Sequence, residues 1–243
     1  MQYICLAAGK GTRFNRLGSY LQKCMYPIGG VPFLQFSIDN LLNSGAFEGG
    51  RDKLVIVVGH FAEQVRAYFT EAHRGVPVHY VEQGETAGTG HAVLRAFEEH
   101  PFSEPAVVWL ADTYIDAEQF RSIGEYREKS VLTLARHVCG REHDERVSLD
   151  PGGTHVTCAW RGTSEYVDIG LWKVPPSIVD SLLSHRTDEH RFLPVVQGAI
   201  QEGLEVAAMI SQQWIHLGGT EPSVTENIRA VTRALLQEAS AYP

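Results

Sequence analysis

The stretch LAAGKGTR, residues 6–13, directly follows a short apolar run at residues 3–5. A strand that ends in such a loop presents backbone N–H groups to an anion, because glycine has no Cβ to keep the main chain away from it. Lys10 and Arg13 add positive charge, and the guanidinium of Arg13 offers a planar fork of donors. The glycine spacing fits neither the dinucleotide fingerprint nor the P-loop. The loop therefore indicates either polyphosphate binding or a tight turn.

Two further segments carry side chains suited to a nucleotide. Lys23 lies in the apolar segment QKCMYPIGG, where it is either a point charge for a phosphate or a lysine whose stem covers a loop. Gln83 begins the segment QGETAGTGHA, and its amide suits the edge of a base. The small residues 88–90 would let a base ring lie flat against the backbone. The same segment also fits a glycine-rich helix start.

Asp112 follows the apolar run at residues 107–110. A carboxylate just past a buried strand, facing a phosphate loop, is a usual way to hold Mg²⁺ beside a nucleotide, although a turn or capping aspartate fits the pattern too. Asp116 is expected to cap the helix that follows it.

Carboxylates and a histidine recur in the second half of the chain. A strand is expected to re-enter the sheet at Glu165, Asp168 and Gly170. The two carboxylates are candidates to bind sugar hydroxyls. The alternative is a plain strand with an acidic residue at its edge. His216, just before the last helix, is a candidate for binding metal or phosphate, or a structural histidine.

The composition excludes several classes of protein. With 21 Lys and Arg against 29 Asp and Glu, the formal net charge is −8, which argues against a nucleic-acid-binding surface. We see no signal peptide and no apolar run of membrane-spanning length, so we expect a cytoplasmic protein without a membrane partner. The four cysteines form no CxxC pair, which favours buried free thiols.

Hydrophobic patterning predicts the elements that position these residues. We expect strands at residues 3–7, 54–58, 76–81 and 106–110, alternating with helices at 33–42, 62–69 and 92–99. This β-α-β rhythm predicts a parallel sheet with ligands at the carboxyl ends of its strands.

The second half is expected to be less regular. We expect strands at residues 130–136, 155–160, 167–174 and 204–210, and helices at 175–183, 192–201 and 221–239, the last capped by Thr220. A Pro-Gly-Gly turn at residues 151–153 suggests a hairpin excursion between the first two strands. We find no linker or repeat and expect one domain, with residues 1–115 as the nucleotide-binding half and 116–243 as the acceptor-binding half.

Together these motifs resemble the sugar-1-phosphate nucleotidylyltransferases, also called nucleotide-sugar pyrophosphorylases. The resemblance extends from Leu6 to the terminal helix. It implies an α/β fold of the nucleotide-diphospho-sugar transferase type, with a doubly wound, mostly parallel but mixed sheet flanked by helices. It makes Arg13, Lys23 and Asp112 the catalytic residues. The implied nucleotide-binding residues are Leu6, Ala8, Gly9, Gly11, Gln83, Gly88 and Thr89, the acceptor-binding residues Glu165, Asp168 and Gly170, and the metal ligands Asp112 and His216.

The chain departs from the family pattern at three places. The proline before the lysine is Gln22, the Glu-Lys element is Trp160-Arg161-Gly162, and His216 stands where the second metal ligand is an acid or an amide. Neutral imidazole is a poor ligand for Mg²⁺, which prefers oxygen.

The resemblance implies Mg²⁺-dependent transfer of a nucleoside monophosphate from an NTP to a sugar-1-phosphate. The alternatives are cytidylyl transfer to a non-sugar phosphate, such as phosphocholine or a phosphonate, and a non-catalytic paralogue that binds nucleotide-sugar. The base, the sugar and the oligomeric state stay open, and a homo-oligomer is compatible with the sequence.

Overall fold

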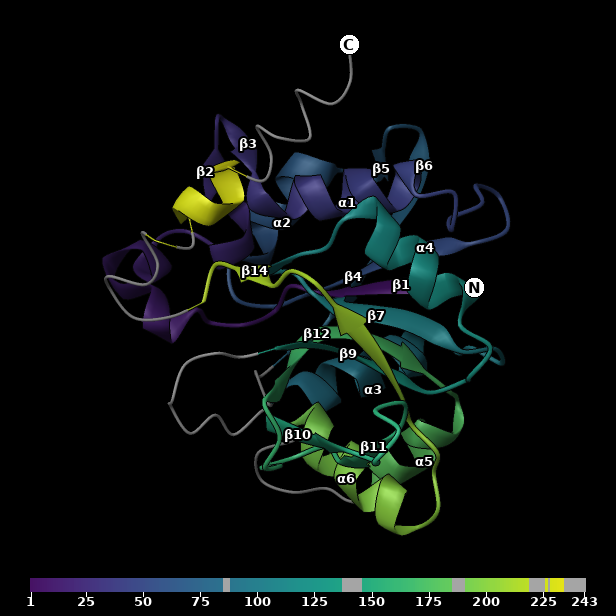
Figure 1. Ribbon diagram of the computed structural model, residues 1–243. Coiled ribbons are helices and arrows are strands. Elements are labelled where there is room, and N and C mark those ends of the chain that lie inside the picture. The colour runs from purple at the N-terminus through teal and green to yellow at the C-terminus, as the bar shows by residue number, and fades with distance from the viewer. Residues whose placement is uncertain (85–87, 137–145, 185–190, 219–225, 227, 234–243) are drawn as a thin grey trace.

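Figure 1 shows a computed structural model of the chain, in which helices cover both faces of a central sheet. The structure describes residues 1–84, 88–136, 146–184, 191–218, 226 and 228–233. The side chains of Arg13 and Asn15 lie outside this description.

Parallel strands form the part of the sheet built from the first half of the chain. β1 (Gln2–Leu6) pairs on one side with β4 (Lys53–Val58) and on the other with β7 (Ala106–Leu110), and β4 pairs with β6 (Val76–Glu82). β1, β4 and β7 are almost continuously apolar and buried, as is typical of strands covered by helices on both faces, whereas β6 is only partly buried. All four carboxyl ends therefore meet at one edge of the sheet.

Antiparallel strands continue the sheet beyond β7. β12 (Tyr166–Val174) pairs with β7, and β9 (Val131–Arg136) pairs with β12, both antiparallel, whereas β13 (Ala207–Ser211) runs parallel to β9. β10 (Arg146–Leu149) pairs with β12, and β11 (Val156–Cys158) with β10. The sheet is thus mixed and mostly parallel in its first half, which confirms the expected fold class.

Two core clusters form on opposite faces of the sheet. Along β1, Tyr3 and Cys5 face one cluster, whereas Ile4 and Leu6 face the other. The first face is covered by α1 (Phe33–Asn43), α2 (Ala62–Phe69) and α4 (Ala117–Glu125). The second is covered by α3 (Thr89–Glu99), α5 (Ser177–Ser184) and α6 (Phe192–Gln201). This is the doubly wound arrangement, because successive connections place helices on both faces.

Short elements complete the edge of the sheet where β1 ends. Two 3₁₀ helices, η1 (Thr12–Ser19) and η2 (Lys23–Met25), follow β1. Further along, β8 (Thr113–Tyr114) pairs with β14 (Ile215–His216). β2 (Pro27–Ile28) pairs with β3 (Val31–Pro32), whereas β5 (Ala72–His73) pairs with the start of β6, at the opposite edge of the sheet. A third apolar cluster joins η1 to the last helix, since Phe14, Leu217 and Val231 are all buried in it.

The structure corrects the expected connection around residues 151–153. The sequence analysis expected this turn to lie in a hairpin between the strands at residues 130–136 and 155–160. In the structure the turn joins β10, a strand that the sequence analysis missed, to β11. β9 pairs with β12 and β13. β10 is short and carries polar residues, so no apolar run marked it. Asp116 caps α4 as expected, accepting a hydrogen bond from the Gln119 N–H at 2.7 Å. Thr220 and most of the expected last helix lie outside the described residues.

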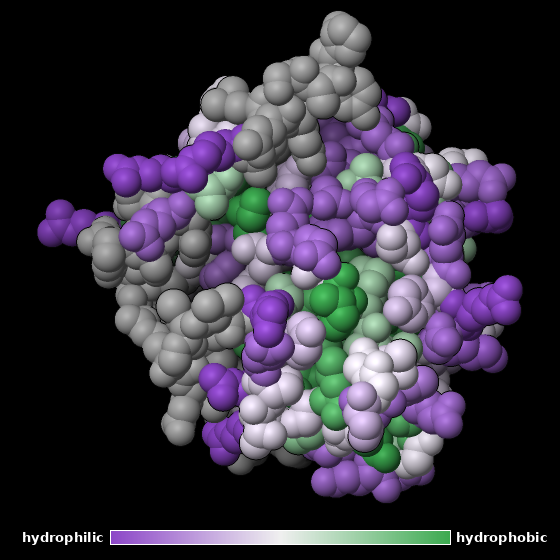
Figure 2. Space-filling model, in the orientation of Figure 1, coloured by the Kyte–Doolittle hydropathy of each residue, from purple (hydrophilic) through white to green (hydrophobic). Residues whose placement is uncertain are grey.

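The surface facing the viewer in Figure 2 is mostly hydrophilic, with hydrophobic residues gathered in a narrow central strip. In the part of the chain that the structure describes, no helix combines the length and apolarity needed to cross a membrane. Cys5 and Cys24 are buried free thiols, as expected. Burial raises the pKa of both thiols well above its usual value.

Candidate active site

A cavity of about 300 Å³ lies at the edge of the sheet where β1 and β7 end. This volume is at the lower end of the range for small-molecule sites, which runs from roughly 300 to 1,000 Å³. The cavity brings together Lys23, Asp112 and all seven residues expected to bind the nucleotide. Its lining comprises Leu6, Ala7, Ala8, Gly9, Gly11, Thr12, Phe14, Gln22, Lys23, Cys24, Gln83, Gly88, Thr89, Ala92, Leu110, Ala111 and Asp112.

The glycine loop, residues 7–11, forms one wall of the cavity. Nothing lies within 4 Å of the position that a Cβ would take at Gly9, so the backbone there faces open space. Gly11 has φ 60°, a left-handed conformation that favours glycine and turns the chain into η1. The loop thus has the exposed main chain that an anion requires. The side chain of Arg13, expected to bind phosphate, lies outside the described residues.

Lys23 and Asp112 form an ion pair inside the cavity. The Lys23 ammonium donates a hydrogen bond to Asp112 Oδ2, and the two side chains keep 16% and 33% of their surface exposed. Burial raises the pKa of Asp112, but the Lys23 ammonium, together with a smaller effect of His216, outweighs burial and leaves the pKa below its usual value. Asp112 is therefore a carboxylate at neutral pH, and a ligand can still reach both charges.

Gln83 lies in another part of the cavity lining and is buried. Its Nε2 donates to the Gly88 carbonyl at 2.8 Å and lies 3.5 Å from His91 Nδ1. The amide nitrogen of Gln83 is bonded to the Gly88 carbonyl of the protein itself. A ligand would therefore bind to the amide oxygen. Nearby, Thr89 Oγ1 accepts a hydrogen bond from the Phe192 N–H at 3.0 Å, which ties the start of α6 to the cavity wall.

The three residues expected to bind the acceptor do not line this cavity. Glu165 forms an ion pair with Arg136, with 2.8 Å between Oε2 and Nε. Asp168 is buried and accepts hydrogen bonds from the Gly170 N–H at 3.1 Å and from Trp172 Nε1 at 2.8 Å. Both carboxylates are thus engaged by the protein itself, and their contact with an acceptor stays a prediction.

Gly170 packs against a residue of the cavity wall. It has φ 80° at an irregularity in β12, and a Cβ there would lie 2.5 Å from Leu110 Cδ1. Gly170→Ala is therefore expected to lower the free energy of unfolding by roughly 2 to 4 kcal/mol, through backbone strain and overpacking. Urea unfolding followed by circular dichroism measures this. Gly153→Ala, at φ 69° with open space around it, is the control for strain alone. Equal losses for the two variants would contradict the packing argument.

His216 lies beside Asp112, because β14 pairs with β8 and the Leu217 N–H donates to the Asp112 carbonyl at 2.8 Å. His216 Nδ1 accepts a hydrogen bond from the Gly218 N–H at 2.9 Å, and its ring stacks on Trp214. A neutral imidazole that accepts at Nδ1 carries its proton on Nε2. This hydrogen bond therefore disfavours His216 as a metal ligand.

One carboxylate is still compatible with Mg²⁺, which usually keeps several waters and binds through one or two carboxylates and substrate phosphates. Among the described residues, no group of three or more His, Cys, Asp or Glu side chains is placed to hold a metal. The donor set therefore fits a cation that is shared with a bound triphosphate better than a metal held by the protein alone.

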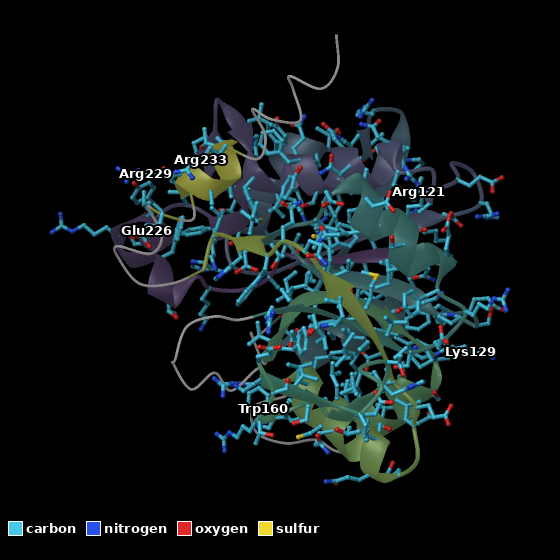
Figure 3. All side chains as sticks on the ribbon, in the orientation of Figure 1. Arg121, Lys129, Trp160, Glu226, Arg229 and Arg233 are labelled. Atoms are coloured by element: carbon cyan, nitrogen blue, oxygen red, sulfur yellow. The ribbon has the colours of Figure 1, made fainter. Side chains whose placement is uncertain are left out.

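Two arginines that the sequence analysis did not assign lie around Trp160. The guanidinium carbons of Arg161 and Arg191 are 5.7 and 5.4 Å from the centre of the Trp160 ring. Figure 3 labels Trp160 next to β10 and β11, in the lower half of the view. Arg191 precedes Phe192, which bonds to Thr89 of the cavity. The signal for Arg161 was present in the sequence, in the segment Trp160-Arg161-Gly162, but Arg191 becomes a candidate only in the folded chain.

Comparison with known proteins identifies a matching family and several relatives. A family model, the MobA-like NTP transferase domain, matches residues 3–173. The UTP–glucose-1-phosphate uridylyltransferase AglF of Haloferax volcanii is 36% identical over 128 residues, which are 53% of this chain and 50% of that protein. The bifunctional protein GlmU of Anaeromyxobacter sp. is 36% identical over 154 residues, 62% of this chain and 30% of GlmU. The chain thus spans half or less of the length of these curated relatives.

A solved structure shares the fold over the whole chain. UDP-glucose pyrophosphorylase, solved in complex with UDP-glucose, superposes with a TM-score of 0.77 and covers 98% of each chain. At 18% sequence identity this likeness establishes the fold alone. It agrees with the mixed, doubly wound sheet described above.

Proposed function

Since this chain belongs to the MobA-like NTP transferase domain family, we propose that it transfers a nucleoside monophosphate from an NTP to a sugar-1-phosphate. The products are a nucleoside diphosphate sugar and pyrophosphate. The observation that carries this proposal is one cavity lined by the glycine loop, Lys23, Asp112 and Gln83. These residues supply what the reaction requires: anion-binding backbone, a cation, a carboxylate for a metal and an amide for a base. In this proposal residues 1–115 bind the nucleotide and residues 116–243 the acceptor.

The reaction is an in-line attack of the acceptor phosphate oxygen on the α-phosphorus of the NTP, with pyrophosphate as the leaving group. It demands little acid–base chemistry, because the main obstacles are bringing two anions together and neutralising charge on the phosphoryl oxygens. The amides of the glycine loop and the guanidinium of Arg13 bind the leaving pyrophosphate. Lys23 turns from Asp112 to the α-phosphate or the incoming phosphate.

Asp112 would hold Mg²⁺ together with the triphosphate. When bound, Mg²⁺ supplies positive charge to the phosphoryl oxygens. The carboxylate of Asp112 is ionised and one-third exposed, so it can reach a metal ion.

We propose UTP as the nucleotide. Gln83 offers its amide oxygen to the ligand, because Nε2 is bonded to Gly88. An acceptor at this position suits the N3–H of uracil, whereas N3 of cytosine is itself an acceptor. The name of the relative AglF, a UTP–glucose-1-phosphate uridylyltransferase, supports the same choice and suggests glucose-1-phosphate as an acceptor.

The acceptor phosphate binds near Arg161 and Arg191 in this proposal. Both guanidinium groups lie over Trp160, and Arg191 directly precedes Phe192, whose N–H donates to Thr89 of the cavity lining. The same two cations argue against phosphocholine, whose ammonium group they would repel. Glu165 gives that ammonium little support, since it already pairs with Arg136.

Replacing either arginine with methionine tests this acceptor site. Arg161→Met and Arg191→Met are each expected to raise the KM for the sugar-1-phosphate roughly tenfold, the loss of one charge-assisted hydrogen bond. The Kd for UTP, measured by calorimetry, should change less than twofold. Arg127→Met, an exposed arginine in the connection between α4 and β9, is the control. An unchanged KM in both variants would contradict this placement of the acceptor.

Pyrophosphate release tests the function itself. The wild-type protein is incubated with Mg²⁺ and ATP, GTP, CTP, UTP or dTTP, each crossed with sugar-1-phosphates, phosphocholine and a phosphonate. The proposal predicts release with UTP and a sugar-1-phosphate. Release with CTP and phosphocholine only would favour cytidylyl transfer. Nucleotide binding by calorimetry without any release would favour the non-catalytic paralogue.

A further inference from the structure

Gln22 is a buried side chain between β1 and η2, with 3% of its surface exposed, and it lines the cavity. Its Nε2 has two hydrogens and lies within hydrogen-bond distance of three carbonyls, those of Ala7 at 2.8 Å, Gly9 at 3.2 Å and His60 at 2.8 Å, so that one hydrogen is shared between two of them. One amide group thus joins both ends of the peptide segment 7–9 to the loop that follows β4. A buried polar group bonded this completely fixes the backbone around it.

These hydrogen bonds set the direction of the amides in the glycine loop. In a planar trans peptide the C=O and N–H bonds point to opposite sides. With the carbonyls of Ala7 and Gly9 turned to Gln22, the N–H groups of Ala8 and Lys10 point away from Gln22. The carbonyl of Ala8, between them, accepts from the His60 N–H at 3.2 Å. Three successive carbonyls of the loop are therefore occupied, and their peptide planes are fixed before a ligand arrives.

Gln22 also fixes the backbone of the proposed catalytic lysine. Its Oε1 accepts a hydrogen bond from the Lys23 N–H at 2.6 Å, which caps η2. The same amide therefore orients the anion-binding loop through its nitrogen and Lys23 through its oxygen. Proline, which the resembled family carries at this place, has no side chain that could make these bonds.

We propose that Gln22 is a positioning residue that preorganises the glycine loop and Lys23 for phosphate. This inference rests on the proposed nucleotidyl transfer and adds a residue that acts without touching the reacting atoms. Preorganised donors are effective because the protein does not have to reorient them during the reaction. A displacement of about 1 Å at such a site costs up to about 10²-fold in rate.

The test uses two variants of similar size. Gln22→Met removes both functions of the amide, whereas Gln22→Glu keeps an oxygen for the Lys23 N–H but presents no NH₂ group to the loop carbonyls. We expect both to raise the Kd for Mg²⁺-free UTP roughly tenfold and to lower kcat by about 10- to 100-fold. Hydrogen exchange at the loop, followed at the His60 N–H that donates to the Ala8 carbonyl, should accelerate by at least tenfold as the loop backbone loosens.

Gln64→Met is the matched control. Gln64 accepts from the Gln22 N–H at 2.8 Å and donates to the Tyr20 carbonyl at 2.9 Å, so it holds the same segment without contacting the glycine loop. It should leave UTP binding and loop exchange unchanged.

The outcomes separate this inference from the proposed function. Wild-type Kd and loop exchange in a folded Gln22→Glu would overturn the positioning role, as would the same losses in Gln64→Met. If Gln22→Met does not fold, as judged by circular dichroism, Gln22→Glu decides alone, and if that variant also unfolds, Gln22 is a structural residue and the inference fails. Absence of pyrophosphate release by the wild type would reject the proposed function, while UTP binding and exchange would still decide the role of Gln22.

Discussion

Asp112→Asn is expected to lower kcat by about 10²- to 10³-fold, the cost of removing a preformed charge stabiliser. Asparagine keeps the size of the side chain but lacks the negative charge that pairs with Lys23 and that we propose holds Mg²⁺. The Mg²⁺ concentration needed for half-maximal rate should rise as well. Initial rates of pyrophosphate release, measured over a range of Mg²⁺ concentrations, give both quantities.

Asp116→Asn is the matched control for this variant. Asp116 lies four residues further on and caps α4, and asparagine caps a helix about as well as aspartate. Its kcat and its Mg²⁺ dependence should equal those of the wild type. A near-normal kcat/KM of Asp112→Asn at limiting Mg²⁺ would show that Asp112 is not the metal ligand.

Lys23→Met is expected to lower kcat by a similar factor of about 10²- to 10³-fold, but for a different reason. The variant keeps the apolar stem of the side chain and removes the ammonium that we propose binds the phosphate. Because Asp112 remains, the Mg²⁺ concentration for half-maximal rate should not increase. The same rate measurements therefore distinguish the two residues of the ion pair.

Lys129→Met is the control for Lys23→Met. Lys129 is exposed, and Figure 3 shows it at the right edge of the molecule, away from Trp160. Its replacement should leave kcat unchanged. If Lys23→Met retained wild-type kcat while binding UTP more weakly, Lys23 would serve in ground-state binding and not in the chemical step.

Much of the fold could be predicted because its patterns are local. The β-branched run of β4, buried on both faces, and the helical periodicity of α1 and α2 are visible in the residues themselves. The carboxyl ends of β1 and β7 then had to meet, since the strands are parallel neighbours. For this reason the glycine loop and Asp112 could be placed at one site from the sequence.

Other features depend on pairing between distant segments. β10 is a short polar strand that exists through its pairing with β11 and β12, and β14 through its pairing with β8. Arg191 comes near Thr89 through a contact over more than a hundred residues of chain. No local pattern encodes such contacts.

Gln22 and His216 show a second limit. In the sequence both residues differ from those that the resembled family carries, and such a difference by itself indicates that a functional side chain has been lost. In the folded chain Gln22 contacts three backbone carbonyls through its amide nitrogen, and His216 is oriented by the Gly218 N–H. Their roles follow from hydrogen bonds that only the structure reveals.

The most direct test of the central claim is phosphorus NMR of the wild-type protein with UTP, glucose-1-phosphate and Mg²⁺. The account predicts that signals of a nucleoside diphosphate sugar and of pyrophosphate rise together in equal amounts, and that both fail to appear with Asp112→Asn on the same time scale. Unchanged UTP over a panel of sugar-1-phosphates, with UTP bound to the protein, would contradict nucleotidyl transfer.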